Sequence, residues 1–187
     1  MNDIYRRLEE ERRRAKQREE NHLLENLATS PSTWEEIVQG LGRNTYPLAL
    51  LASTSLLSLD ELAKAIDDAW TMPDNPQGQL SQPVWLDYFE RVGYLENGTR
   101  RPRPLLPITV WRGSVSSRRR RWSWTSDLDR AAWFATRLTA AGLDGRVWTT
   151  IAPPYAQLAH FYGVDSRNED EHVVNTKGLK ITEHPHE

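Results

Sequence analysis

The sequence predicts an α+β fold in which a helical region precedes a β-rich region. Up to about residue 93, apolar residues recur at the three-to-four-residue spacing of amphipathic helices. From Pro107 onward, short segments alternate apolar and polar residues as strands do, and a helix-like segment follows Ser126. Helices that precede and interrupt a set of strands, without regular βαβ repetition, are typical of α+β domains.

The composition excludes several classes of protein. The chain has 187 residues, which favours one domain with a helical extension. It has no cysteine, so disulfides and thiolate metal sites are excluded. A net charge of −2 argues against a general nucleic-acid binder. We find no signal peptide and no apolar run long enough to cross a bilayer, and therefore expect a cytoplasmic protein without membrane contact.

Three segments are expected along the chain. Residues 1–30 form a charged helical arm with few apolar positions, supported by pairs such as Glu10 with Arg14. A helix this polar cannot bury a wide face, so it is either a solvated arm or an arm that binds a partner or dimerises. Residues 31–82 contain short helices and a proline-rich linker, and residues 83–187 form the β-rich domain.

Two patterns predict helix starts in the middle segment. Ser32 with Glu35 and Ser58 with Glu61 have the spacing of capping boxes. The first is followed by Trp34, Ile37, Val38 and Leu41 at helical spacing, and the second by Leu62, Ile66 and Trp70 on one face.

The β-rich domain is expected to begin with a helix that starts at Pro83 and ends at Gly93, with Trp85, Tyr88, Phe89 and Val92 buried. Strands are predicted at residues 108–112, 121–125, 145–153, 171–175 and 177–183, and a short helical turn at 155–163. Ser126 is predicted to cap a helix whose apolar face holds Ala132, Phe134, Ala135 and Leu138.

The common catalytic templates are missing from the sequence. It contains no GxGxxG, GxxxxGK[ST], HExxH or GxSxG motif, and its histidines are scattered, apart from His184 and His186 near the end. Three other features remain: an arginine at a strand end, hydroxyl groups at a strand-to-helix junction, and acidic residues before a late strand. An arginine fork binds phosphate, and a carboxylate stabilises developing positive charge. The features are Arg112, Ser123-Trp124-Thr125 and Glu169-Asp170-Glu171.

These features resemble the ADP-ribosyltransferases of the Arg / Ser-Thr-Ser / Glu-x-Glu class, over the region from Pro107 to the end. "VWRG" is similar to the first-strand arginine motif, "SWTSDLDRAAWFA" resembles the Ser-Thr-Ser motif and the helix after it, and "EDEHVV" resembles the Glu-x-Glu motif. The helical part is similar to uncharacterised proteins of actinobacteria and their phages. Trp124 and Thr125 depart from the serine motif, and Ser126 leaves its register open by one residue.

The resemblance implies a two-sheet β core with inserted helices, NAD as substrate and no metal. Glu171 takes the position of the catalytic glutamate and Glu169 that of its upstream partner. The residues expected to bind NAD are Arg112, Gly113, Ser123, Thr125 and Ser126, with Trp124, Phe134 and Trp111 as aromatic walls that also suit core positions.

The resemblance therefore implies an NAD-dependent mono-ADP-ribosyltransferase that modifies a macromolecular acceptor, in a bacterial or phage-infected cell. A protein acceptor is expected; a nucleic-acid acceptor is an alternative through Arg118, Arg119, Arg120 and Arg121, which also suit a solvated basic loop. Three other functions remain open: an NAD glycohydrolase on the same fold, a non-catalytic protein that binds a nucleotide or a partner, and a nucleic-acid-binding regulator built on the helical half.

Overall fold

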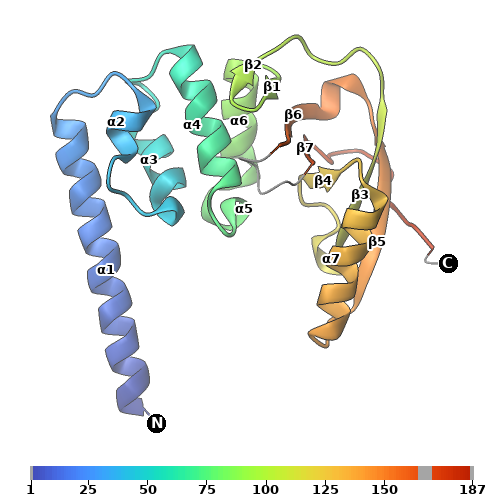
Figure 1. The fold of residues 1–187 in the computed structure, drawn as a ribbon, viewed down its shortest axis with the longest axis horizontal. Coiled ribbons are helices and arrows are strands. Elements are labelled where there is room, and N and C mark those ends of the chain that lie inside the picture. Colours follow the sequence, from blue (N-terminus) through green and yellow to red (C-terminus); the bar gives the residue numbers. More distant parts are fainter. Residues whose placement is uncertain (1, 164–169, 186–187) are drawn as a thin grey trace. The chain divides into compact units, whose positions relative to one another are not determined.

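The structure is a computed structural model that describes residues 2–163 and 170–185 (Figure 1). The chain divides into two compact units, Met1–Leu80 and Ser81–Glu187. Helices make up the first unit, and the second contains a mixed sheet, so the predicted α+β class is confirmed. No helix within the described ranges is long and apolar enough to cross a membrane.

The first unit contains five α-helices among the described residues. They are α1 (Asn2–Ala28), α2 (Trp34–Val38), α3 (Tyr46–Ser53), α4 (Leu59–Thr71) and α5 (Pro76–Gln79), with a 3-10 turn η1 (Arg43–Thr45) before α3. The predicted charged helix is α1, and the side chains of residues 5–18 are exposed. Its last turns hold α2, because the Asn26 amide donates to the carbonyls of Ile37 and Gln39 at 2.9 and 3.0 Å.

The helix caps of this unit differ in part from the prediction. The capping box of α2 is formed by Thr33 and Glu36, so the predicted pair is wrong by one residue. Ser32 and Thr33 both carry a hydroxyl, and Glu35 and Glu36 both carry a carboxylate, so the sequence allows a capping box at either position. The structure uses the second position, and Trp34 is buried in the core. Ser58 caps α4 as predicted, but the Glu61 carboxylate accepts from the Trp34 main-chain N–H at 2.8 Å instead of closing the box.

Trp34 organises the core of the first unit. Its indole N–H donates to Asp68 at 2.8 Å, and its ring meets Tyr46 edge to face at 5.8 Å. Burial raises the pKa of Asp68, although the hydrogen bond from Trp34 opposes that shift. The predicted face of α4 is buried as expected, with Leu62, Ile66 and Trp70 at most 2% exposed.

The second unit holds the sheet. It contains α6 (Gln82–Val92) and α7 (Leu128–Ala140), and 3-10 turns η2 (Ser116–Arg118) and η3 (Pro154–Ala156). Its strands are β1 (Leu95–Glu96), β2 (Thr99–Arg100), β3 (Ile108–Val115), β4 (Ser123–Thr125), β5 (Gly145–Ala152), β6 (Gln157–Phe161), β7 (Glu171–Val174) and β8 (Thr182–Glu183). Their order is β2-β1-β6-β7-β4-β3-β5-β8.

The strands pair into one continuous sheet in the described part of the chain, whereas the resemblance implied two sheets. The three-residue strand β4 makes the connection. It pairs with β3 at one position, Trp111 with Thr125, and with β7 at three positions. The pair β1–β6 is parallel, and the other neighbouring pairs are antiparallel.

The prediction of a helical turn at residues 155–163 is wrong for most of its length. Only η3 is helical there, and β6 follows it as a strand between β1 and β7. A short apolar run fits a buried strand and a helical turn equally well, and only the long-range pairing decides between them. Two predicted strands are also shorter than expected, because β4 begins at Ser123 and β8 contains only Thr182 and Glu183.

The helix α6 follows the prediction, with Pro83 in its first turn, Gly93 at its C-cap with φ of 82°, and the four expected residues buried. The segment after it, for which no strand was predicted, is a hairpin of β1 and β2. Asn97 and Gly98 have φ of 43° and 67°, as the two central residues of a tight hairpin turn require.

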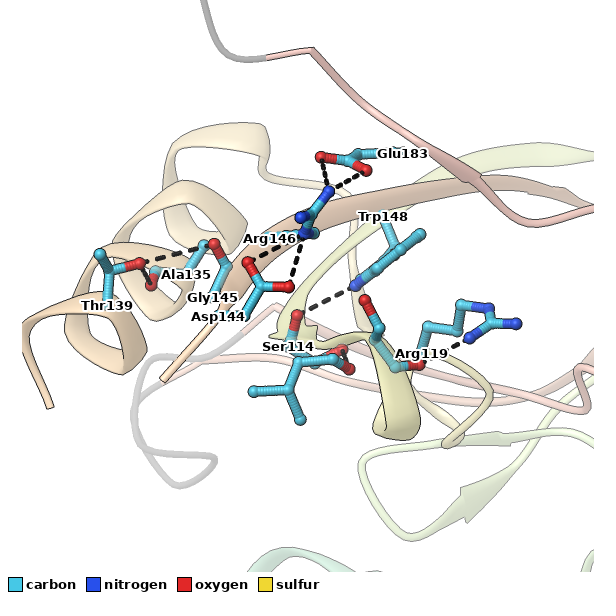
Figure 2. Close-up of polar contacts among 11 residues, drawn as sticks. Ser114, Arg119, Ala135, Thr139, Asp144, Gly145, Arg146, Trp148 and Glu183 are labelled. Atoms are coloured by element: carbon cyan, nitrogen blue, oxygen red, sulfur yellow. Dashed lines mark hydrogen bonds and ion pairs between the residues drawn. The ribbon is translucent and has the colours of Figure 1, made fainter. Parts of the chain in front are cut away.

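The helix α7 packs closely along β3 and β5 (Figure 1). Its buried residues are Ala131 and Ala135, rather than the broader face that was predicted. A Cβ atom added to Gly113 would lie 2.1 Å from the Ala131 carbonyl oxygen, and one added to Gly145 would lie 2.1 Å from that of Ala135. The small residues of helix and strands therefore allow the two backbones to touch. Figure 2 shows Gly145 beside Ala135 and Thr139.

This contact makes Gly113 a sensitive position for stability. We expect Gly113→Ala to lower the free energy of unfolding by about 1–3 kcal/mol, since an overpacked contact forces backbone shifts. Denaturant unfolding of the purified variant measures this change. Gly42→Ala is the control, because its added Cβ meets only the flexible Glu19 carboxylate, at 3.4 Å. Equal stability of the Gly113 variant and wild type would contradict the close approach.

Candidate functional site

The three segments singled out in the sequence lie on neighbouring strands. Arg112 is on β3, the serine segment forms β4, and Glu171 begins β7. Thr125 pairs with Trp111 on one side and with Glu171 on the other. Residues that are remote in the sequence are therefore brought to one part of the sheet. Glu169 lies outside the described residues.

The half-buried side chain of Arg112 is held by main-chain carbonyls. Its Nη1 donates to the carbonyl of Ser123, and its Nε donates to that of Arg118 at 3.3 Å. Burial lowers the pKa of Arg112 to about 10, the negative charge of Glu171 opposes this shift, and Arg121 and Arg118 add to it. The guanidinium is thus still a cation at neutral pH, and Glu171 is the charge that favours it.

The serine segment is mostly occupied with structure. Trp124 is 2% exposed, its indole N–H donates to the Arg121 carbonyl at 2.9 Å, and its ring belongs to a core cluster with Val110 and Trp148. The Thr125 hydroxyl accepts from the main-chain N–H of Asp127 at 3.1 Å. Trp124 is therefore a core residue, and Thr125 shapes the turn that leads into α7.

Ser126 does not cap α7, in contrast to the prediction. Asp127 is the cap, because its carboxylate accepts from the Arg130 main-chain N–H at 3.1 Å. The Ser126 hydroxyl donates instead to the Asp170 carboxylate, and its main-chain N–H reaches the same oxygen at 3.3 Å. Asp170, the middle residue of the acidic motif, had no role in the sequence-based prediction.

Asp170 also joins two histidines that the sequence did not connect. His160 Nε2 lies 2.5 Å from Asp170 Oδ1, and His172 Nε2 lies 3.9 Å from the same oxygen. The two imidazole rings stack with centroids 4.0 Å apart and an interplanar angle of 10°. The prediction that the histidines are scattered is therefore wrong. His160 pairs with His172 across β6 and β7, and this register was hidden because β6 was predicted to be helical.

The charges of this cluster are set by its surroundings. Burial favours the neutral carboxyl of Asp170, but hydrogen bonds from Ser126 and His160 outweigh it and hold the pKa below its ordinary value. Burial and the neighbouring His160 lower the pKa of His172 to about 4, so its ring is neutral at pH 7. A carboxylate therefore faces a neutral imidazole and a second, more exposed histidine.

The three aromatic residues predicted as walls do not form one surface. Trp111 packs with Ala131, Ala135 and Val147 below α7, whereas Trp124 belongs to the other core cluster. Because Trp111 pairs with Thr125, its side chain and that of Trp124 point to opposite faces of the sheet. Phe134 is half-buried on α7, edge to face with Trp133 at 4.9 Å.

The basic loop uses at least two of its arginines to brace the fold. Arg119 donates to the Ser116 carbonyl at 2.8 Å and lies 5.6 Å from the ring centre of Trp148 (Figure 2). Arg120 donates to the carbonyls of Thr176 and Leu179 at 3.2 and 3.4 Å. Two of the four arginines considered for nucleic-acid binding, Arg119 and Arg120, therefore hold loops in place through hydrogen bonds to main-chain carbonyls.

Comparison with known proteins adds no relative to this picture. No protein-family model, curated protein or solved structure matches the chain. The function therefore has to be inferred from the site itself and from the motifs that the sequence carries.

The double contact of Arg112 makes a prediction about stability. We expect Arg112→Lys to lower the free energy of unfolding by about 1–3 kcal/mol, because an ammonium has no planar fork and cannot reproduce the two hydrogen bonds to the Ser123 and Arg118 carbonyls. Arg103→Lys is the control, since the side chain of Arg103 donates a solvent-exposed hydrogen bond to the Tyr155 main-chain carbonyl at 2.8 Å. Denaturant unfolding of both variants gives the comparison, and equal losses would show that the Arg112 fork has no special role in the fold.

Proposed function

We propose that the chain is an NAD-dependent mono-ADP-ribosyltransferase, which releases nicotinamide and transfers ADP-ribose to a macromolecular acceptor. One observation carries this proposal. The segments that resemble the arginine, serine and glutamate motifs occupy the neighbouring strands β3, β4 and β7. Ser126 of the serine segment and Asp170 of the acidic segment are 44 residues apart in sequence and hydrogen-bonded in the fold.

The roles of the residues follow from the chemistry of the reaction. Cleavage of the bond between nicotinamide and ribose develops positive charge on the sugar, and the Glu171 carboxylate is suited to stabilise that charge. Arg112 supplies a guanidinium for a phosphate or ribose group of NAD. The hydroxyls of Ser123 at the start of β4, Thr125 at its end and Ser126 directly after it supply further polar groups along this strand.

A second candidate is a non-catalytic protein that binds a nucleotide or a partner, and two observations favour it. The Arg112 fork already donates to two main-chain carbonyls, so NAD has to compete with them. In addition, the cross-strand pairs place the side chain of Glu171 on the same face of the sheet as those of Thr125 and Trp111. Arg112 is the residue after Trp111, so its side chain leaves β3 on the opposite face. Nicotinamide release distinguishes the two candidates, because a binding protein retains NAD intact.

The decisive residue for catalysis is Glu171. We expect Glu171→Gln to reduce nicotinamide release by about 100-fold or more, which is the scale for loss of a strong electrostatic element in the transition state. Release from labelled NAD is followed for the purified protein, with binding of NAD measured in parallel. The control is Glu90→Gln, which removes an exposed carboxylate on α6. Turnover close to wild type in the Glu171 variant would remove this residue from the mechanism.

Glu169 separates a transferase from an NAD glycohydrolase. In the family that the motifs resemble, the upstream glutamate positions the acceptor, so Glu169→Ala should abolish labelling of the acceptor while largely retaining nicotinamide release. Labelled NAD in a cell lysate identifies the acceptor as protein or nucleic acid, and the variant is then assayed on it. If both activities fall together, Glu169 belongs to the NAD site or the fold. If neither changes, the residue has no part in transfer.

A further inference from the structure

We propose that His160, Asp170 and His172 form a binding site for a divalent transition-metal ion of the zinc class. The ligand atoms of these three residues lie within 4.8 Å of one another. Two of the residues come from a registered pair on adjacent strands, since His160 on β6 pairs with His172 on β7. Paired residues of an antiparallel ladder share a face, so both imidazoles necessarily project to the same side.

The distances fit a site that closes on an ion. Both Nε2 atoms face the same carboxylate oxygen, at 2.5 Å for His160 and 3.9 Å for His172. Tetrahedral coordination with bonds of about 2.0 Å needs about 3.3 Å between ligand atoms, and the two observed distances bracket this value. A hydrogen bond explains the shorter contact, whereas 3.9 Å is too long for one, so hydrogen bonding alone does not explain why His172 converges on Asp170.

The surroundings hold the ligands in place. The second carboxylate oxygen of Asp170, Oδ2, is occupied by the hydroxyl and main-chain N–H of Ser126, which leaves Oδ1 directed at the histidines. The two rings stack with centroids 4.0 Å apart and planes 10° apart, so their Nε2 lone pairs are nearly parallel and one ring has to turn about its Cβ–Cγ bond for both nitrogens to reach one ion. Outer contacts that orient a ligating carboxylate are a regular feature of protein metal sites.

The ligand set and its exposure indicate the kind of ion. Two imidazoles and one carboxylate suit Zn²⁺ and its neighbours Co²⁺, Ni²⁺ and Cu²⁺, whereas Mg²⁺ and Ca²⁺ prefer oxygen ligands. The side chains of His160 and Asp170 are 22% and 32% exposed, so an ion can enter from solvent and keep a water or another small ligand as its fourth partner. A bound ion would connect β6 to the start of β7, where Asp170 directly precedes Glu171 in the sequence.

The test is metal binding by the full chain. The purified protein is stripped with a chelator, dialysed and titrated with Zn²⁺, with bound metal measured by elemental analysis and stability by thermal unfolding. We expect one equivalent of Zn²⁺ to bind and to raise the unfolding temperature, and Co²⁺ to give the visible absorption of a four-coordinate site. Absence of binding at one equivalent would overturn the proposal. These measurements do not involve NAD, so their outcome is independent of the proposed enzymatic activity.

Variants locate the bound ion. His160→Gln and Asp170→Asn should abolish the stoichiometric binding and the thermal shift, while His184→Gln, which removes a histidine after β8, should keep both. Circular dichroism of the metal-free variants checks that they fold. In the wild-type protein, histidine ¹⁵N resonances provide a second measurement that needs no substitution: Zn²⁺ should shift those of His160 and His172. Retained binding in His160→Gln, or shifts confined to other histidines, would refute the site.

Discussion

The candidate site depends on how the short strand β4 is held between β3 and β7. It pairs with β3 at a single position, Trp111 with Thr125. One such pair does little to fix the position of a strand. The Arg112 side chain adds the missing restraint, because it donates across to the Ser123 carbonyl at the other end of β4. This contact places the Arg112 cation in a poorly hydrated position, and the burial lowers its pKa to about 10. The negative charge of Glu171 on β7 opposes part of that shift. The same arginine therefore links all three strands.

Local patterns predicted the elements that local forces determine. Helix α6 and strands β5 and β7 follow apolar patterns that are clear along each segment, α1 follows its pairs of opposite charges, and β3 extends three residues beyond the predicted strand. The prediction of β6 was wrong because its stability comes from pairing with β1 and β7, which no local pattern records. The histidine cluster was missed for the same reason. His160 and His172 meet through that register. Asp170 is held beside them because the Ser126 hydroxyl donates to its carboxylate, whereas Ser126 was predicted to cap α7.

Two residues of the arginine motif have a clear structural purpose. Gly113 is required where α7 touches β3, and Arg112 is required to hold the loop and β4. A sequence selected only to maintain this packing would contain the same Arg-Gly pair, so this part of the resemblance follows from the fold as readily as from the chemistry. Glu171 takes part in the same arrangement, because its negative charge favours the cationic form of Arg112.

The strand order also determines when the site can form during synthesis. The strand β7 lies between β4 and β6 in the sheet but follows both in sequence. When the ribosome has completed β3, β4 and α7, the position beside β4 is still empty, and the nascent chain exposes an unpaired strand edge there. Pairings across long stretches of sequence form slowly, because the intervening chain has to be ordered first. The carboxylate of Glu171 thus comes near Arg112 only after β5 and β6 have also emerged, and a product that ends before β7 leaves the Arg112 cation without this balancing charge.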